Sequence, residues 1–164
     1  RCTGHDAPAP DAKRGIAVMR INTTRFGQID VAAGDVIRFP GGLPGLEDCR
    51  EWSLLADATN DAVGWLQCTT RGDVALAVVS PRRFVPSYRV RIPRSELQPL
   101  GLTDVGDAQV VVVAARTGTT LTLNLKAPIV INVETRTGRQ VVASGDLPLR
   151  HEVLPGQPPA KRSA

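Results

Sequence analysis

The sequence of 164 residues has few of the side chains that catalytic and metal sites use most. Its three cysteines are Cys2, Cys49 and Cys68, and no Cys-x-x-Cys pair occurs, so the pattern supports neither a disulfide framework nor a zinc site. Its two histidines are His5 and His151, which are far apart and have no partner at metal-ligand spacing. We therefore expect no metal and no cofactor.

Long apolar runs and nucleophile motifs are also absent. The longest apolar run is Val110–Ala115, against the roughly 20 residues that a membrane-spanning helix needs. No Gly-x-Ser-x-Gly motif occurs, and Gly41–Gly45 lacks the Lys-Ser/Thr pair of a phosphate-binding loop. The sequence therefore predicts neither a membrane protein nor an enzyme.

Aromatic residues are scarce, with two Trp, one Tyr and three Phe, whereas 42% of all residues are hydrophobic. A chain of this length can bury about two-thirds of its unfolded surface, so we expect a core built from aliphatic side chains. Charge of one sign is in small excess: the formal net charge is +4, and residues 19–150 hold 15 basic and 13 acidic side chains. This excess is weak support for a nucleic-acid partner.

The densest basic stretch spans residues 82–94 and interleaves arginines with aromatics: Arg82, Arg83, Phe84, Tyr88, Arg89, Arg91 and Arg94. A single-stranded RNA platform would use this mixture, stacking bases on rings beside a cationic groove. Strand alternation is the other interpretation, with Tyr88, Val90 and Ile92 facing inward. We favour alternation because no known RNA-binding signature occurs, and we keep RNA binding as the alternative function.

The two ends of the chain differ from its centre in composition and in hydrophobic periodicity. Residues 1–18 contain Ala7–Pro10 and have no hydrophobic periodicity before Ile16, and residues 155–164 are rich in proline. Such compositions do not form regular elements. We predict a disordered N-terminal extension over residues 1–18, one folded domain over 19–154 and a disordered tail over 155–164.

Within the central domain the apolar residues recur mainly with a period of two, which indicates half-buried strands rich in β-branched residues. Three hairpins are predicted, and their turns are at residues 32–35, 117–120 and 136–139. Further strands are expected at 52–55, 65–68 and 74–79. Helical signal is limited to a short turn at 95–98 and a cap at Thr103-Asp104. The fold class is therefore mostly all-β, an antiparallel barrel or sandwich.

The stretch Phe39–Leu46 is unusual because it contains two prolines and three glycines. Proline fixes φ and glycine permits positive φ, so the composition specifies one loop conformation. The loop is either a tight crossover with Phe39, Leu43 and Leu46 in the core, or a rigid, exposed docking loop. The sequence does not decide between the two.

The stretch Asn124–Asn132 places Pro128 inside an apolar strand pattern, and strand prolines belong at edges or bulges. The asparagines at its two ends can bind the backbone of a bulge. Lys126 is the only lysine between residues 14 and 160. We favour a bulge that also presents Lys126 to a partner over a bulge with no further role.

Taken in order, several segments resemble the FliW family of flagellar assembly factors: residues 24–29, 37–48, 65–68, 73–81, 123–132, 138–142 and 148–151. The two most specific are Phe-Pro-Gly-Gly-Leu-Pro-Gly at 39–45 and Asn-Leu-Lys-Ala-Pro-Ile-Val-Ile-Asn at 124–132. The resemblance spans residues 19–154 and implies a small antiparallel β-barrel-like domain with one or two short helical turns. Family members tend to be acidic, whereas this chain is mildly basic, with local acidic residues at 47–51 and at Asp57 and Asp61.

The resemblance also implies a function: a cytoplasmic, non-enzymatic protein that binds the translational regulator CsrA and relieves its repression of flagellin mRNA. Flagellin is the competing partner, and CsrA is bound away from its RNA-contacting surface. Because CsrA is a strand-exchanged dimer, two copies of this chain per CsrA dimer are expected, each a monomer when unbound. No direct contact with nucleic acid or membrane is expected. The candidate partner-binding residues are Phe39, Pro40, Leu43, Pro44, Asn124, Lys126, Pro128, Asn132, Arg150 and His151.

Overall fold

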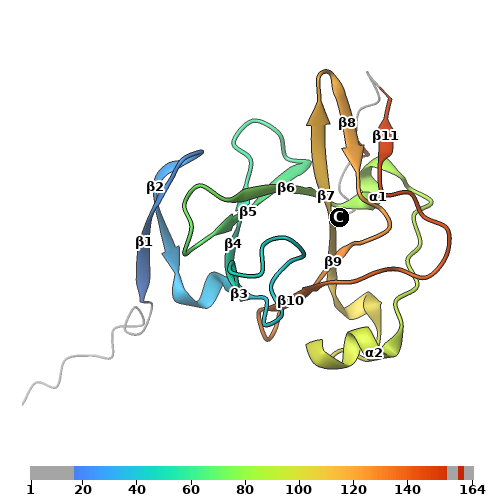
Figure 1. Cartoon of the computed structure of the whole chain (residues 1–164), viewed down its shortest axis with the longest axis horizontal. Helices are drawn as coiled ribbons and strands as arrows, with labels where there is room; N and C mark the ends of the chain where they lie inside the picture. Colours follow the sequence, from blue (N-terminus) through green and yellow to red (C-terminus); the bar gives the residue numbers. More distant parts are fainter. Residues whose placement is uncertain (1–16, 155–158, 161–164) are drawn as a thin grey trace, which may run out of the picture.

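Seven strands close a barrel in the computed structural model, which describes residues 17–154 and 159–160 (Figure 1). Around the barrel, in spatial order, they are β7 (Gln109–Thr117), β6 (Ala75–Val79), β5 (Val63–Cys68), β4 (Glu51–Ala56), β3 (Val36–Arg38), β10 (Thr137–Gln140) and β9 (Ile129–Asn132). The pairing of β9 with β7 closes the ring. Every neighbouring pair is antiparallel except β3 and β10, which meet in parallel at Arg38 and Thr137. The expected β-barrel-like class is confirmed.

The chain bends near Pro128, between two strands that both pair with β7. β8 (Thr120–Leu123) and β9 pair with different halves of β7, and the chain between them leaves one register for the other. β8 continues outward to pair with β11 (His151–Val153), so the β7–β8 hairpin and β11 stand above the barrel in Figure 1. The interruption that Pro128 imposes therefore lets β9 stay in the closed ring while β8 leaves it.

The first predicted hairpin is wrong. β2 (Gly27–Ala32) pairs with β1 (Val18–Thr23), and the short 3₁₀ turn η1 (Ala33–Asp35) carries the chain into the barrel at β3. The competing turn lies earlier: the Thr23 hydroxyl donates to the Gly27 carbonyl at 2.7 Å, and Gly27 has φ of +67°. β3 pairs with β4 on one edge and with β10 on the other, so neither edge of β3 is left for β2.

The other two hairpins are confirmed, one with a shift. Thr117 pairs with Thr120 between β7 and β8. In the last hairpin Asn132 pairs with Thr137, so the turn covers residues 133–136 and not 136–139. The Asn132 carboxamide oxygen accepts the Glu134 N–H at 3.0 Å, and Arg136 adopts φ of +54°. These two features close the turn early.

Helical structure among the described residues is short. Besides η1, it comprises α1 (Pro81–Phe84), α2 (Arg94–Leu97) with its extension η2 (Gln98–Leu100), and η3 (Val105–Asp107). The expected turn after Pro93 is α2, and the expected cap is formed by Asp104, whose side chain accepts the Gly106 N–H at 2.6 Å. Pro81 starts α1 at a position where a missing N–H costs nothing.

The core is aliphatic with a small aromatic centre. Its largest fully buried side chains include Trp52 and Phe39, whose rings meet edge to face with centroids 6.4 Å apart. Cys49 and Cys68 are buried free thiols in the same cluster. Desolvation raises the pKa of Cys49 to about 11, so this thiol stays protonated and packs as a small apolar group.

The predicted disordered ends lie mostly outside the described residues. At the N-terminal side β1 begins at Val18, one residue before the expected boundary. At the C-terminal side the backbone of Ala160 makes two hydrogen bonds with Arg83. The Ala160 N–H donates to the Arg83 carbonyl at 2.7 Å, and the Ala160 carbonyl accepts from the Arg83 side-chain Nε at 2.8 Å. This part of the predicted solvated tail is therefore docked on the domain.

Candidate functional site

The loop between β3 and β4 is partly core and partly surface. Phe39 is fully buried and Leu43 is 2% exposed, whereas Pro40 and Pro44 face solvent. Gly42 has φ of +67°, and a Cβ there would lie 2.7 Å from the Glu47 backbone, so only glycine fits. The two interpretations of this loop thus apply to different residues: its apolar side chains anchor it, and its prolines are exposed.

Phe39 connects this loop to the β9–β10 hairpin. A Cβ on Gly138 would lie 2.6 Å from the Phe39 ring, so the ring lies directly against the backbone of β10. On the neighbouring strand, buried Asn132 donates from Nδ2 to the Leu100 carbonyl at 2.8 Å. Phe39 and Asn132 therefore hold together three segments that are distant in the sequence.

Between these segments lies a cleft of about 510 Å³, here named the proline cleft. Pro40, Gly41 and Pro44 form one side; Pro99, Leu100 and the β10 residues 137–140 form the other. The Arg139 guanidinium on the far side is fixed by Glu96 at 3.1 Å. The cleft is therefore a preformed hollow with proline walls, because its backbone is held by Phe39 below and by proline φ angles at the rim.

Glu47 lines the proline cleft and supplies its negative charge. Its carboxylate accepts the Gly45 N–H at 3.0 Å. Hydrogen bonds from the backbone N–H groups of Glu47 itself and of Gly45 lower the pKa of this carboxyl group. Asp48 beside it is exposed, so the loop presents carboxylates next to the exposed prolines.

The segment around Lys126 is hydrogen-bonded to a later part of the chain and is not a bare strand edge. Residues 141–148 cover it: Val141 N–H donates to the Pro128 carbonyl, Ala143 N–H to the Lys126 carbonyl, and Lys126 N–H to the Pro148 carbonyl. The Lys126 ammonium group donates to the Gly145 carbonyl. Asn124 accepts the Ala127 N–H at 3.0 Å, as expected for a bulge.

The candidate residues therefore fall into two groups. Phe39, Pro40, Leu43, Pro44 and Asn132 form or support the proline cleft. Lys126, Arg150 and His151 gather where residues 145–151 pack against 123–126, with Asn124 and Pro128 in the bend below. Pro128 and Asn132 are buried and Arg150 is exposed. No sequence pattern pointed to Pro99, Leu100 or Arg139, because these residues belong to the cleft only through tertiary contacts.

The stretch 82–94 is not a strand, which corrects that expectation, although its alternation holds. Tyr88 is 4% exposed and donates its hydroxyl to the Leu125 carbonyl at 2.9 Å, while Arg89 and Arg91 face solvent. Phe84 is half-buried against the same core cluster. The rings that an RNA platform would need for base stacking are therefore used in the core.

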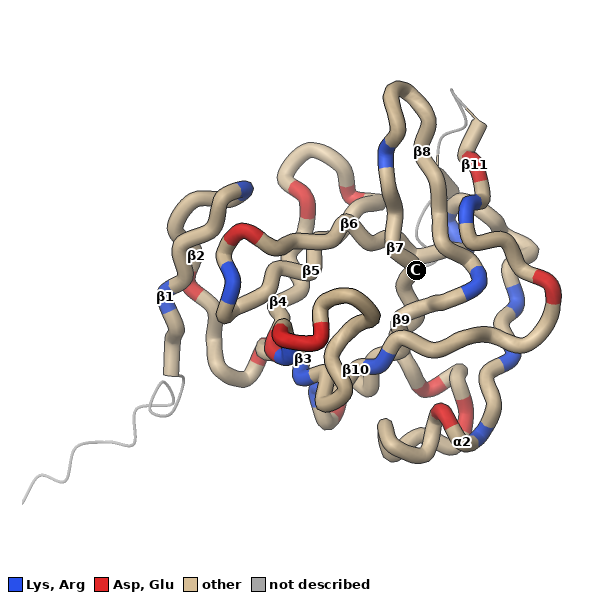
Figure 2. Tube along the Cα trace, in the orientation of Figure 1, with Lys and Arg blue, Asp and Glu red and all other residues tan. Residues whose placement is uncertain are grey.

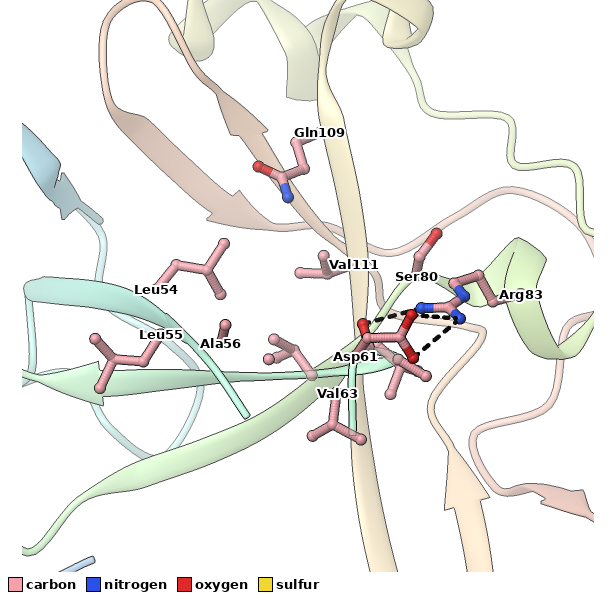
Figure 3. Close-up of a pocket in the computed structure, with 13 residues that line it drawn as sticks. Leu54, Leu55, Ala56, Asp61, Val63, Ser80, Arg83, Gln109 and Val111 are labelled. Carbon is pink, nitrogen blue, oxygen red and sulfur yellow. Dashed lines mark hydrogen bonds and ion pairs between the residues drawn. The ribbon is translucent and has the colours of Figure 1, made fainter. Parts of the chain in front are cut away.

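A second hollow, of about 280 Å³, lies between β4, β5, β6 and the start of α1 (Figure 3). Its walls are mainly apolar and include Leu54 and Val111. At its edge Arg83 Nη1 donates to the Asp61 carbonyl at 2.9 Å, and Nη2 lies 3.4 Å from the Asp61 carboxylate. The Arg83 side chain is only 11% exposed. This pair joins α1 to the β4–β5 loop and is a structural feature of the hollow.

The described residues contain no group of three or more His, Cys, Asp or Glu side chains placed to hold a metal ion. Within this same part of the chain, none of the helices combines the length and apolar character that crossing a membrane requires.

The chain is similar in sequence to a known family of proteins over most of its length. The model of the FliW protein family matches residues 20–153. The flagellar assembly factor FliW of Bdellovibrio bacteriovorus is 36% identical over 139 residues, covering 83% of this chain and 79% of that protein. The protein of the same name from Thermoanaerobacter pseudethanolicus is 36% identical over 140 residues, covering 83% and 93%.

A solved structure agrees. A crystal structure of the flagellar assembly factor FliW superimposes with a TM-score of 0.77 at 28% identity, covering 84% of this chain and 98% of that chain. The matched region contains both specific motifs, the proline cleft and the closed barrel. The chain belongs to the FliW family of flagellar assembly factors.

Proposed function

We propose that this chain works in flagellar assembly as a non-enzymatic cytoplasmic protein that binds CsrA and flagellin as alternative partners. The observation that carries the proposal is the family match over residues 20–153, which includes both motifs on which the partner assignment rests. While flagellin is abundant it occupies the chain. Once flagellin is secreted, the free chain captures CsrA and flagellin mRNA is translated.

Such a switch needs no bond chemistry, only a difference in binding free energy. Each tenfold change in relative occupancy takes about 1.4 kcal/mol. Because CsrA is a two-fold symmetric dimer in this proposal, it offers two equivalent sites and takes two copies of the chain. A preformed surface suits this role, since little conformational entropy is lost on binding.

We place one partner site at the proline cleft. Its walls are held by buried Phe39 and by the Asn132 side chain, so the hollow exists before any partner arrives. Exposed prolines give apolar contact, and Glu47 and Arg139 at the rims give charges of both signs. The local carboxylates of this loop would meet a basic partner such as an RNA-binding protein, although the chain as a whole is mildly basic.

The test fills the cleft without disturbing the fold. A Cβ at Gly41 meets no atom within 4 Å and φ there is not positive, so Gly41→Arg extends a long side chain over the cleft. Gly34 on η1 has the same open surroundings and lies outside the cleft, so Gly34→Arg is the matched control. Calorimetry with purified CsrA and with flagellin measures both affinities.

Gly41→Arg is expected to weaken binding of at least one partner about tenfold or more, with Gly34→Arg unchanged. If the unmodified chain binds neither CsrA nor flagellin, the proposed function is wrong. If it binds both and Gly41→Arg does so equally well, the function stands and the cleft is not the site.

Lys126 provides the test of the second group of candidate residues. Lys126→Glu removes the ammonium group that holds the Gly145 carbonyl and reverses its charge. If this region is a partner surface, affinity for CsrA or flagellin falls while the melting temperature of the free chain changes little. A variant that melts early, yet binds normally in its folded fraction, would give Lys126 a purely structural role.

A further inference from the structure

Four of the five arginines between residues 82 and 94 have no carboxylate partner within the part of the chain that the structure describes. Arg83 is held by Asp61 and Ala160. Among the described residues, no Asp or Glu lies within ion-pair distance of Arg82, Arg89, Arg91 or Arg94. In Figure 2, blue segments that mark Lys or Arg are spaced along the chain that descends to α2 at the right of the view. Cationic side chains concentrated without counter-charges make this surface attractive to an anion.

Three of these four, Arg82, Arg89 and Arg91, border two hollows of about 420 and 370 Å³, which share Arg89 as a lining residue. We name them together the arginine groove. Its lining residues that matter here are Arg82, Val90, Val105 and Val110 in the larger hollow, and Arg91 and Leu147 in the smaller. Aliphatic side chains therefore form much of its floor, and guanidinium groups stand at its edges.

Hydrogen bonds hold one of the guanidinium groups of the groove in place. Arg89 Nη1 donates to the carbonyls of Tyr88 at 3.0 Å and Pro86 at 3.4 Å, which fixes the guanidinium group and leaves its other N–H groups available. The Lys126 ammonium group donates a hydrogen bond to the carbonyl of Gly145, which lines the smaller hollow. Asp146 is the acidic residue among those that line the groove. The balance of lining charge is therefore positive.

The main chain along the groove is also open. The backbone N–H groups of Arg89 and Val90 donate to no acceptor among the described residues. Residues 89–90 belong to no strand or helix. Successive N–H groups of an extended chain point to opposite sides, so a peptide lying along the groove could accept a hydrogen bond from one of these two N–H groups while its side chains alternate between floor and edge.

We propose that the arginine groove binds an extended segment of a partner protein in which acidic and aliphatic side chains alternate. A nucleic acid fits less well, because Tyr88 is buried and Phe84 is half-buried against the core, so neither ring stands free for base stacking. An aliphatic floor suits Val or Leu side chains and not phosphates. The groove is separate from the proline cleft, sharing no lining residue with it, so this inference stands independently of the function proposed above.

The experiment measures fluorescence anisotropy of a labelled synthetic peptide that alternates Glu and Val, titrated with the full chain. A peptide with Lys in place of Glu and a single-stranded oligouridylate are the comparison probes. Arg89→Glu/Arg91→Glu is the test variant, and Arg116→Glu is the matched control, because Arg116 is exposed on β7 and also lacks an ion pair among the described residues.

The unmodified chain and Arg116→Glu are expected to bind the Glu-Val peptide, and the double variant to bind it about tenfold more weakly or worse, because attraction becomes repulsion. Binding should weaken as salt rises. If the double variant does not fold, Arg82→Ala/Arg91→Ala replaces it with the same expectation. Absence of peptide binding, equal binding by the test variant, or tighter binding of the oligouridylate would each overturn the proposal.

Discussion

Replacing Gly138 by alanine tests the contact that supports the proline cleft. The added methyl group would lie 2.6 and 2.7 Å from two carbons of the Phe39 ring, well inside van der Waals contact. The ring is fully buried and packs edge to face on Trp52, so it has no free space to move into. Overpacking of this kind costs about 1–3 kcal/mol of unfolding free energy.

A matched substitution and a rescue separate the steric clash from other effects. Gly41→Ala meets no atom within 4 Å and should be neutral or stabilising by up to about 1 kcal/mol. Phe39→Leu shortens the ring and should reduce the cost of Gly138→Ala in the double variant, with a coupling of about 0.5–3 kcal/mol.

Urea denaturation followed by tryptophan fluorescence measures these free energies, since Trp52 reports the packing around Phe39. In a domain of this size each kcal/mol lowers the melting temperature by about 2–4 °C. If Gly138→Ala is as stable as Gly41→Ala, or if Phe39→Leu does not reduce its cost, the argument that the Phe39 ring needs a glycine beneath it is refuted.

Three further predictions concern titration and docking. Burial raises the pKa of Tyr88, the single tyrosine, to about 12, so its ultraviolet titration should occur well above pH 10. The contribution of the protonated Tyr88 hydroxyl to the free energy of unfolding is present below pH 10 and is lost as the pH rises through 12. The Trp65 N–H and neighbouring donors lower the pKa of Asp57 to about 2, so stability present above pH 4 should fall as pH drops toward 2, less steeply in Asp57→Asn, as chemical denaturation across pH would show. A Cβ on Gly72 would lie 1.9 Å from the Asn22 carbonyl, so Gly72→Ala should undock the β1–β2 hairpin and make it sensitive to protease; unchanged cleavage would contradict this.

Several elements could be predicted from the sequence because their signals are local. The β7–β8 hairpin follows from alternation on both sides of a Gly-containing turn, and Gly118 has φ of +63° there. The turn after Pro93 and the Asp104 cap likewise depend on neighbours within a few residues. The bend at Asn124–Pro128 was visible because proline cannot donate to a sheet.

Predictions that required a choice of partner were less successful. The strand expected to pair with β3 pairs with β1 instead, because β4 and β10 occupy the two edges of β3, and neither of these pairings shows in the local pattern. The bulge at Lys126 was predicted, but the hydrogen bonds that residues 141–148 make to it were not, because the local pattern does not show them. Alternation at 88–92 was right about which side chains are buried and wrong about the strand.

The amino-acid sequence by itself determined the aliphatic barrel strands, the rigid conformation of the 39–46 loop and, through its two motifs, the family. Only the tertiary structure decided that Pro40 and Pro44 face Pro99 and Arg139 across a cleft, and that Arg89 and Arg91 border a groove. The physical reason is range. Backbone dihedral preferences and period-two burial act between near neighbours, whereas barrel closure brings residues about a hundred positions apart, such as Phe39 and Gly138, into contact.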